Sequence, residues 1–326
     1  MKVLVAPLNW GVGHATRCIP IIHFLLNRGD EVHIAGDGQS LELLQSYFPK
    51  LTFHELPPLN ITYTKRLPLY TAFPRMAARM FFHYFRDRRA IRQLMKQEHF
   101  DCIFSDNRYG IRSAEAKSYL ITHQLRVCFG CKNSWLERLS GRIIRRLIAP
   151  FNACLVPDYD SDNNLAGRID KPVDGLKVLY TGPQSRFPLD EPDIPLPRYD
   201  LLIILSGPEP QRTKFEQLVA SLAASSIKRI MLVRGTKTPP EAALPANLST
   251  LDFVGDLMLQ TLIHNSKAII ARAGYSTIMD LNALSRGAVL VATPHQPEQE
   301  YLATWLDGKR GFVRAEQDEN SLREWF

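Results

Sequence analysis

A glycine-rich turn followed by a histidine, N-W-G-V-G-H-A-T-R at residues 9–17, comes directly after the apolar run M-K-V-L-V-A-P-L. Gly11 and Gly13 leave space for a ligand to approach the backbone, because they carry no side chain. His14 stands between this turn and the expected start of a helix. A neutral imidazole is a good general base near physiological pH. The motif therefore predicts a substrate-binding loop in which His14 takes a proton from a reacting group.

Two further apolar runs in the first half of the chain end in polar residues. Asp106 ends F-D-C-I-F-S-D and is a second candidate base, while His123 and Gln124 end S-Y-L-I-T-H-Q. In open α/β sheets, ligands bind beyond the carboxyl ends of the strands. Both runs are therefore candidates for the same site as the glycine turn.

The second half of the chain contains two more turns of small residues between an apolar run and a helix-like segment. Backbone N–H groups at such helix starts bind phosphate. The residues are Ser206 and Gly207 in L-S-G-P-E-P-Q, and Gly274, Ser276 and Thr277 in A-R-A-G-Y-S-T. Asp280 lies one turn into the second helix, where it can accept hydrogen bonds from ribose hydroxyls. These features indicate a nucleotide site.

Short β-rich runs alternate with helix-like segments along the chain, which predicts parallel, doubly wound sheets. In the first half, strands are expected in 2–7, 31–36, 51–56, 100–107, 118–124, 153–158 and 177–182, with helices over 15–28 and 41–48. In the second half, strands are expected in 199–208, 229–235, 248–255, 267–274 and 288–294, with helices over 215–223, 276–286 and 299–306.

A proline-dense stretch, P-Q-S-R-F-P-L-D-E-P-D-I-P-L-P, separates these two series. It has no hydrophobic periodicity, which is typical of a linker. We therefore expect an N-terminal domain over residues 1–184, a linker over 185–198 and a C-terminal domain over 199–326. Two α/β domains joined in this way are expected to bind a ligand in the cleft between their strand ends.

A nicotinamide-dinucleotide site is the main competing interpretation of the first turn. It would use Gly11 and Gly13, with Asp37 after the second strand to bind a ribose. Thr16 occupies the place where this fingerprint has Gly or Ala, and His14 would crowd the pyrophosphate. The pattern therefore favours another ligand.

The composition indicates a globular protein, with 45% apolar and 22% charged residues, and a formal net charge of +7. The segment 65–96 contains nine Lys or Arg, a single acid, and six interleaved aromatic residues. It is either a solvated helix with its aromatic residues packed inward or a surface for an anionic membrane, a lipid pyrophosphate or nucleic acid. An anionic membrane or lipid is the partner that we expect, and nucleic acid is not.

Neither the N-terminus nor the cysteines suggest export. The N-terminal run is too short for the apolar region of a signal peptide and lacks a small-residue cleavage site, so we expect a cytoplasmic protein. The five cysteines are scattered along the chain and imply no disulfide framework. Cys128 and Cys131 form a C-F-G-C pair, which supplies at most half of a zinc site. Chance or packing is favoured for this pair over metal or redox chemistry.

Taken together, these motifs resemble the two-domain GT-B glycosyltransferases. The similarity lies in G-V-G-H-A-T-R after the first strand, the S-G-P turn, and R-A-G-Y-S-T-I-M-D-L followed by P-H-Q-P-E-Q-E-Y. It extends over nearly the whole chain and is most specific from Ile269 to Tyr301. The T-H-Q at 122–124, at the end of an expected strand, resembles the corresponding strand end in glycosyltransferase family 28. That family includes the bacterial enzyme that adds N-acetylglucosamine to a lipid-linked peptidoglycan precursor.

The resemblance implies a UDP-sugar donor held by the second domain and an unidentified acceptor, for which a lipid-linked compound is a candidate, held by the first. It places Ser206 and Gly207 near the diphosphate, and it places Gly274, Ser276 and Thr277 as a cap on the phosphates. It also assigns Asp280 to the ribose, the backbone of Phe253 and Val254 to the base, and Gln299 and Glu300 to sugar hydroxyls. His14 matches the family's loop histidine, near Gly11, Gly13 and Thr16.

Metal-free members of this fold stabilise the leaving diphosphate with backbone N–H groups, a helix dipole and basic side chains. We therefore expect neither a metal nor another cofactor, with Arg234 and Arg272 as candidate cations. The expected function is an inverting hexosyl transfer. A UDP-sugar 2-epimerase or hydrolase on the same fold, and a non-catalytic basic α/β binding protein, remain the alternatives.

Two departures from the family pattern affect these expectations. The S-G-P-E-P-Q turn has fewer glycines than its counterparts, which leaves its phosphate contacts open. The fold normally continues into a helix that returns to the first domain, whereas this sequence ends at S-L-R-E-W-F. We expect either a shortened chain or a different closure.

Overall fold

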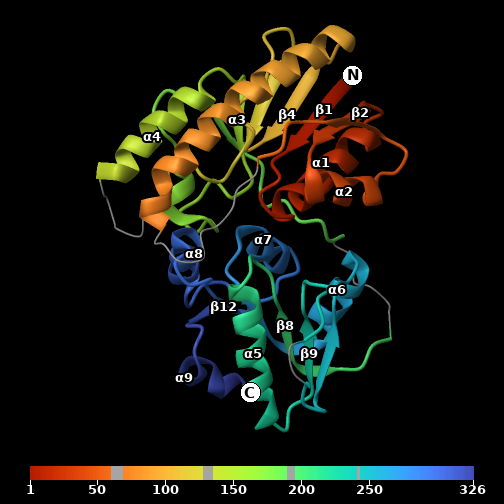
Figure 1. Ribbon diagram of the computed structural model, residues 1–326, viewed down its shortest axis with the longest axis vertical. Coiled ribbons are helices and arrows are strands. Elements are labelled where there is room, and N and C mark those ends of the chain that lie inside the picture. Colours follow the sequence, from red (N-terminus) through yellow and green to blue (C-terminus); the bar gives the residue numbers. More distant parts are fainter. Residues whose placement is uncertain (60–68, 128–134, 189–194, 241–242) are drawn as a thin grey trace. The chain divides into compact units, whose positions relative to one another are not determined.

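The computed structural model describes the chain except residues 60–68, 128–134, 189–194 and 241–242, and the side chains of 69–77, 135 and 136. It divides into two compact units, Met1–Arg186 and Phe187–Phe326 (Figure 1). The division falls within the stretch expected to be the linker. Three predicted features lie wholly or partly outside the described residues. They are the pair Cys128 and Cys131, the middle of the expected linker, and the beginning of the basic aromatic segment.

The N-terminal unit is built on a parallel sheet in the order β3-β2-β1-β4-β5-β6-β7. Its elements are β1 (Lys2–Pro7), α1 (Gly13–Asn27), β2 (Glu31–Gly36), α2 (Gly38–Tyr47), β3 (Thr52–Glu55), α3 (Leu69–Gln97), β4 (Cys102–Asp106), β5 (Lys117–Ile121), α4 (Trp135–Ile148), β6 (Ala153–Val156), the 3-10 helix η1 (Gly167–Asp170) and β7 (Val178–Tyr180).

The C-terminal unit repeats this plan with a parallel sheet in the order β10-β9-β8-β11-β12-β13. Its elements are β8 (Tyr199–Ile204), α5 (Gln211–Ala224), β9 (Ile230–Val233), β10 (Leu248–Leu251), α6 (Asp256–His264), β11 (Ser266–Arg272), α7 (Tyr275–Ala283), β12 (Val289–Val291), α8 (Pro297–Leu306), β13 (Val313–Ala315), α9 (Glu319–Leu322) and the 3-10 helix η2 (Arg323–Trp325).

Helices cover both faces of the first sheet. Alternate side chains of each strand point to opposite faces, so a single strand contributes to the core on both sides. Val3 and Val5 of β1 pack in a cluster with residues of α1 and α2. Leu4 and Ala6, the alternate residues of the same strand, pack in a second cluster that includes Ile91 of α3. A strand buried on both faces must be apolar throughout, which explains the continuous run in β1.

The prediction of two doubly wound parallel sheets is confirmed. Four elements of the C-terminal unit were not predicted: α6, β13, α9 and η2. The short run D-L-M-L-Q-T-L-I-H of α6 is buried over Leu259–Ile263, so its pattern lacks the polar face that marks a surface helix. β13 has only three residues, two of them exposed, and its pairing with β12 defines it as a strand.

Candidate active site

The loop carrying His14 and the carboxylate of Asp106 lie at the point where the first sheet reverses its strand order. β1 and β4 are neighbours in that sheet, and Pro7 pairs with Asp106 at their carboxyl ends. α1 and α3 leave this edge for opposite faces of the sheet. Such a switch point opens a crevice at the strand ends, which is where ligands bind in open α/β sheets.

His14 and Asp106 form a hydrogen-bonded pair, with Nδ1 of His14 2.7 Å from Oδ1 of Asp106. Nδ1 is also 2.9 Å from a nitrogen of the Arg17 guanidinium, which only donates. The same Arg17 nitrogen also donates to Oδ1 of Asp106, so it does not need Nδ1 as its acceptor. Because an unprotonated Nδ1 would turn its lone pair toward the carboxylate, we assign the proton to Nδ1, which donates it to Asp106. Nε2 is then the basic nitrogen, and it has no hydrogen-bond partner among the described residues.

Arg17 contacts both members of this pair and fixes the position of the Asp106 carboxylate. Its guanidinium donates to both carboxylate oxygens of Asp106, and its third nitrogen lies 3.1 Å from Nδ1 of His123. Arg17, Asp106 and His123 are buried, whereas the His14 side chain is 14% exposed. Asp106 is therefore placed to orient His14 rather than to touch an acceptor itself. His123, from the loop after β5, belongs to the network through Arg17.

The surroundings keep the imidazole neutral and the carboxyl ionised. Burial, together with the charge of Arg17, holds the pKa of His14 below its ordinary value, although Asp106 acts in the opposite direction. Burial acts to raise the pKa of Asp106, but the charges of Arg17 and His14 outweigh it and lower that pKa. The pair therefore has the charge states of a general base and its orienting anion.

The predicted loop residues shape the approach to His14. Gly11 has φ of +82°, a left-handed conformation that favours glycine, and a Cβ there would meet no atom within 4 Å. The hydroxyl of Thr16 donates to the carbonyl of Gly13 at 3.1 Å, which holds the turn at the helix start. The backbone N–H of Gln124 donates to the hydroxyl of Thr122, on the other side of His123.

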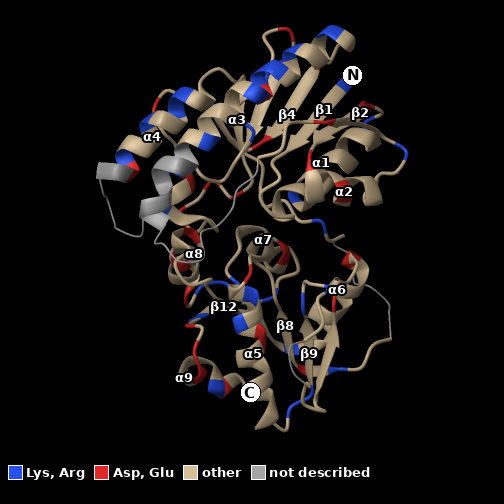
Figure 2. Cartoon of the chain, in the orientation of Figure 1, with Lys and Arg blue, Asp and Glu red and all other residues tan. Residues whose placement is uncertain are grey.

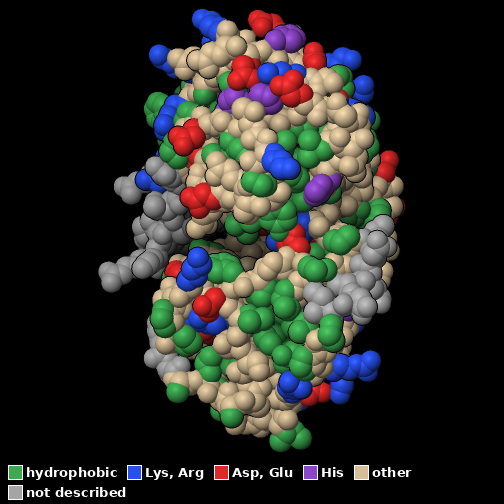
Figure 3. Space-filling view, turned by 90° about the vertical axis from the view of Figure 1, so that its right-hand side faces the viewer, with side chains coloured by type: hydrophobic (Ala, Val, Ile, Leu, Met, Phe, Trp, Pro, Cys, Tyr) green, Lys and Arg blue, Asp and Glu red, His purple; other side chains and the backbone are tan. Residues whose placement is uncertain are grey.

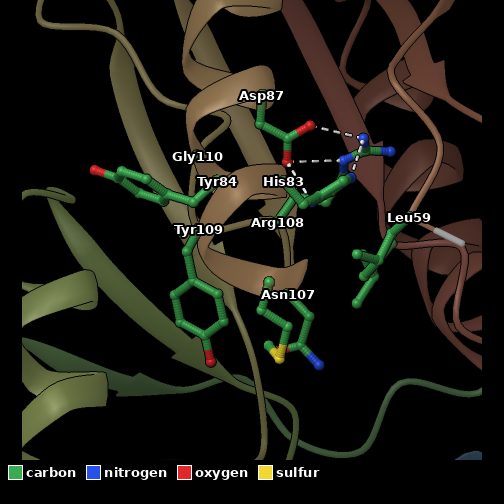
Figure 4. A pocket seen from close by; sticks show the side chains of 10 residues that line it. Leu59, His83, Tyr84, Asp87, Asn107, Arg108, Tyr109 and Gly110 are labelled. Carbon is green, nitrogen blue, oxygen red and sulfur yellow. Dashed lines mark hydrogen bonds and ion pairs between the residues drawn. The ribbon is translucent and has the colours of Figure 1, made fainter. Parts of the chain in front are cut away.

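A small cavity of about 30 Å³ lies beside this edge, lined by residues of α3 and of the loop after β4 (Figure 4). It has room for about one water molecule. Asn107, directly after Asp106, lines it with φ of +54°, and its buried Oδ1 has no hydrogen-bond partner among the described residues. Arg108 lines the cavity as well, in a buried ion pair with Asp87 at 2.7 Å.

The acid needed by the dinucleotide alternative is already engaged. Asp37 forms an ion pair with Arg108 at 2.7 Å and accepts a hydrogen bond from Asn9 at 3.1 Å. The carboxylate is thus part of the buried charge network under α3. This arrangement disfavours Asp37 as a ribose ligand.

The predicted phosphate-binding turns occupy the equivalent switch point of the second sheet. Ser206 and Gly207 follow β8, and Gly274 follows β11, its neighbour in the sheet. Gly207 has φ of +102°, which again favours glycine. Ser276 and Thr277 lie in the first turn of α7, which no side chain caps, and Asp280 is buried further along the helix. The positive end of the α7 dipole is thus at the carboxyl edge of the sheet.

Gln299 and Glu300 hold the loop after β12. Oε1 of Gln299 accepts from the N–H of Thr293 at 2.8 Å, and Oε1 of Glu300 accepts from the N–H of His295 at 2.9 Å. The hydroxyl of Thr293 is buried without a hydrogen-bond partner in the described residues, and it lies 3.6 Å from where a Cβ on Gly207 would be. The loop therefore brings a donor or acceptor group to the phosphate turn that the sequence motifs did not indicate.

The remaining predicted donor residues differ in accessibility. Arg234 is buried and forms ion pairs with Glu216 at 2.6 Å and Asp252 at 2.7 Å. Arg272 is buried over the ring of Phe215, and both terminal nitrogens donate to backbone carbonyls. Burial lowers the pKa of Arg272 to about 10. The charge of Arg234 is thus compensated by two carboxylates, whereas the groups that accept from Arg272 are uncharged. In the loop between β10 and α6, Phe253 is 60% exposed and Val254 is half-buried.

The carboxylate spacing D-x-D, which can hold a metal ion, occurs twice in the run D-Y-D-S-D from Asp158 to Asp162. Asp158 is buried, and its oxygens accept from the N–H groups of Leu165 and Ala166 at 2.8 and 2.7 Å. Asp162 forms a surface ion pair with Lys171 at 2.9 Å. Asp158 therefore stabilises the loop after β6, and the spacing alone does not indicate a metal site.

Three of the aromatic residues of the basic aromatic segment do not pack inward. On α3, Phe81, Phe82 and Phe85 are more than half exposed, and their rings contact one another. On the opposite side of the helix, Ile91 is buried in a cluster with residues of the sheet, and His83 and Asp87 are buried beside Arg108. We call the exposed side, together with Arg86 and Arg89, the α3 outer face.

Basic residues lie along α4 as well as α3 (Figure 2). On α4, Leu139 and Ile143 are exposed among Arg138, Arg142, Arg145 and Arg146. No helix of the described residues is both long enough and apolar enough to cross a bilayer. The role of these surfaces as a membrane contact stays a prediction.

No protein-family model matches this sequence. It is 25% identical over 314 residues to an uncharacterized glycosyltransferase from Methanosarcina mazei, covering 92% of this chain and 81% of that protein. A protein of the same name from Methanosarcina acetivorans is 24% identical over 324 residues, with the same coverage.

Solved glycosyltransferases have the same fold. The calicheamicin glycosyltransferase CalG4 superimposes with a TM-score of 0.69 at 13% identity, covering 99% of this chain and 88% of that one. MurG from Acinetobacter baumannii gives 0.59 at 15%, covering 99% and 89%. UGT89C1 of Arabidopsis thaliana, solved with UDP-L-rhamnose, gives 0.61 at 14%, covering 99% and 88%. The chain therefore has the GT-B glycosyltransferase fold, whereas assignment to family 28 stays a prediction.

Proposed function

We propose that the chain is an inverting, metal-independent glycosyltransferase that transfers a sugar from a UDP-linked donor to an acceptor hydroxyl. The observation that carries this proposal is the His14–Asp106 pair at the switch point of the first sheet, with Nε2 left basic. The names of the two archaeal relatives support the reaction class. The structural neighbour that was solved with UDP-L-rhamnose supports a nucleotide-sugar donor.

In the proposed reaction, Nε2 of His14 accepts the proton of the acceptor hydroxyl as the hydroxyl oxygen attacks the anomeric carbon of the donor. The new carbon–oxygen bond forms as the bond to the diphosphate oxygen breaks, and the electron pair leaves with the nucleoside diphosphate. Attack from the side opposite the leaving group inverts the anomeric carbon. Asp106 and Arg17 hold the imidazole in its working tautomer, and Asp106 stabilises the imidazolium that forms.

The leaving diphosphate needs electrostatic stabilisation as its charge develops. We propose that the N-terminus of α7 and the turn at Ser206 and Gly207 provide it, with the buried charge of Arg272 behind them. Asp280 binds the ribose, the loop at Phe253 and Val254 binds the base, and Gln299 and Glu300 bind the sugar hydroxyls. This scheme requires no metal at the leaving group.

Replacing Asp280 by alanine is expected to weaken UDP binding about tenfold or more. Hydrogen bonds to a charged group contribute roughly 1.5–3 kcal/mol, and this variant removes those to the ribose. Calorimetry on the folded variant measures the effect. Asn282→Ala is the control, since Asn282 lies on the same helix but accepts from the surface residue Arg310. An unchanged UDP affinity in Asp280→Ala would remove the ribose assignment.

The transferase is distinguished from its alternatives by what happens to the donor alone. NMR of a UDP-sugar incubated with the protein should show only slow hydrolysis, because transfer requires an acceptor. Rapid formation of the C2 epimer would identify the 2-epimerase instead. A binding protein without catalysis would bind UDP and leave the sugar intact even with a panel of acceptor hydroxyls.

The acceptor is proposed to be lipid-linked, because the α3 outer face combines exposed aromatic and basic side chains. Interfacial helices of this composition bind anionic lipid. In vesicle co-sedimentation, Phe81→Ser with Phe85→Ser should lower affinity for phosphatidylcholine–phosphatidylglycerol vesicles at least tenfold, since burying a Phe contributes roughly 1.5–3 kcal/mol.

Phe24→Ser is the matched control, because Phe24 is 63% exposed on α1, away from this face. Wild-type binding should also fall with added salt and be weaker on pure phosphatidylcholine, as expected for a basic surface. Equal sedimentation of the wild type and the double variant would exclude the α3 outer face as the lipid contact.

A further inference from the structure

A second histidine cluster lies away from the His14 site. Nδ1 of His33 and Nε2 of His54 are 2.9 Å apart, and Oε2 of Glu98 is 3.3 Å from the same Nδ1. The other oxygen of Glu98 is 4.0 Å from Nε2 of His54. One nitrogen from each histidine and one carboxylate oxygen all lie within 4.8 Å of one another. Figure 3 shows histidines among acidic and basic side chains on one face of the N-terminal unit.

Three separate elements hold these side chains. β2 and β3 pair in parallel with Ala35 opposite His54, which puts both histidines on the sheet face that α3 covers. Their rings stack with centroids 5.2 Å apart, and Phe100 meets both edge-on. Glu98 directly follows α3. His33 is buried, and the side chains of His54 and Glu98 are only partly exposed, so the cluster is well fixed.

The tautomer of His33 leaves an electrostatic conflict inside the cluster. Its Nε2 is 3.0 Å from Oε1 of Glu31, so Nε2 carries the proton and donates it to that carboxylate. The lone pair of Nδ1 then accepts from Nε2–H of His54 at 2.9 Å. Oε2 of Glu98 lies 3.3 Å from the same Nδ1 with no proton between the two atoms, so the nitrogen and the carboxylate oxygen repel each other. A cation between them, either an added proton or a metal ion, removes the repulsion.

Lys2 only partly compensates for this charge. Its ammonium lies 2.9 Å from Oε2 of Glu98 and 3.2 Å from Oε1 of Glu31, so it neutralises the carboxylates from outside the cluster. The ion pairs of Lys2 are thus with the two carboxylates rather than with the imidazoles. Lys2 is therefore a competitor of any metal ion for Glu98.

We propose that His33, His54 and Glu98 bind a divalent transition-metal ion of the zinc class, with Glu31 orienting His33. Two imidazoles and one carboxylate form a set that suits such ions, and a carboxylate that accepts from a ligating histidine is the usual outer partner. The ion would tie β2 and β3 to the end of α3, far from any step of the transfer reaction. The inference is independent of the proposed activity.

Cobalt(II) titration of the tag-free full-length protein tests the site, because tetrahedral cobalt gives a strong visible absorption band. The wild type should bind one equivalent with that band. His54→Gln and Glu98→Gln should lower the affinity by at least about 100-fold, and Glu31→Gln, which removes only the outer partner, by about 10–100-fold. Lys2→Met should strengthen binding, because it removes the competing ammonium.

His99→Ala is the control, since His99 is 69% exposed directly after Glu98 and outside the cluster. It should bind cobalt like the wild type. Zinc should displace cobalt and raise the melting temperature of the wild type but not of His54→Gln. The proposal is overturned if the wild type gives no band, or if folded His54→Gln and Glu98→Gln bind cobalt as the wild type does. The cluster would then be a protonated histidine–carboxylate pair.

Discussion

Replacing His14 by alanine is expected to lower turnover by a factor on the order of 10²–10⁴, the usual contribution of a general base. Nε2 is the only nitrogen of this imidazole available to an acceptor, because Nδ1 donates to Asp106. Donor affinity should change little, since the predicted donor residues belong to the other unit. Initial rates at varied donor and acceptor concentrations separate the loss in kcat from any change in KM.

The pH–rate profile provides an independent test of the same role. Burial and Arg17 hold the pKa of His14 below its ordinary value of about 6.5, so the base is neutral and active above that lowered pKa. Wild-type kcat/KM should therefore fall only at a pH below the usual histidine range, and His14→Ala should lose that ionisation. His23→Ala, an exposed histidine on the same helix, is the control. Near-normal turnover in His14→Ala would assign a structural role to His14.

Replacing Asp106 by asparagine is expected to lower turnover by a comparable factor, on the order of 10²–10⁴, although Asp106 touches no substrate. An asparagine amide can donate to Nδ1, which moves the imidazole proton to Nε2 and removes the lone pair that faces the acceptor. The carboxylate also acts to raise the pKa of His14. The acid limb of any remaining activity should therefore move to lower pH. A purely structural role would not shift this limb.

This substitution also leaves the buried Arg17 without its ionic partner. Removing one member of a buried ion pair typically destabilises a protein by about 3–5 kcal/mol, so the melting temperature should fall as well. Circular dichroism at the assay temperature establishes that the variant remains folded. Asp162→Asn, which breaks a surface ion pair in the same unit, should change neither property. Normal turnover in folded Asp106→Asn would contradict the orienting role.

Local sequence patterns predicted most of the secondary structure. Continuous apolar runs marked the buried strands, and β2 occupies the predicted range, because strands covered on both faces must be apolar throughout. Gly29 ends α1 with φ of +80°, as a glycine at a helix end is expected to do. Short or unusually buried segments such as β13 and α6 were not predicted, because their hydrophobic patterns show too little periodicity.

The sequence by itself determined the order of strands and helices, the glycine turns at two strand ends, and the histidine at the first of them. Arg17 could have been found too, because it lies one helical turn after His14 and on the same side of α1. The i,i+3 spacing of His14 and Arg17 indicates a shared partner only once a carboxylate is known to face that side of α1.

Only the tertiary structure decided which distant residues meet His14. Asp106 lies 92 residues away, and β1 and β4 become neighbours through backbone pairing that no local pattern encodes. The same holds for the aromatic residues of α3, since a 3.6-residue period gives a helix two faces without saying which of them a sheet will cover. On α3, the buried carboxylate of Asp87 must be paired, and its partner Arg108 comes from the loop after β4, so the side of the helix that carries His83 and Asp87 faces inward. Phe81, Phe82 and Phe85 therefore lie on the exposed side.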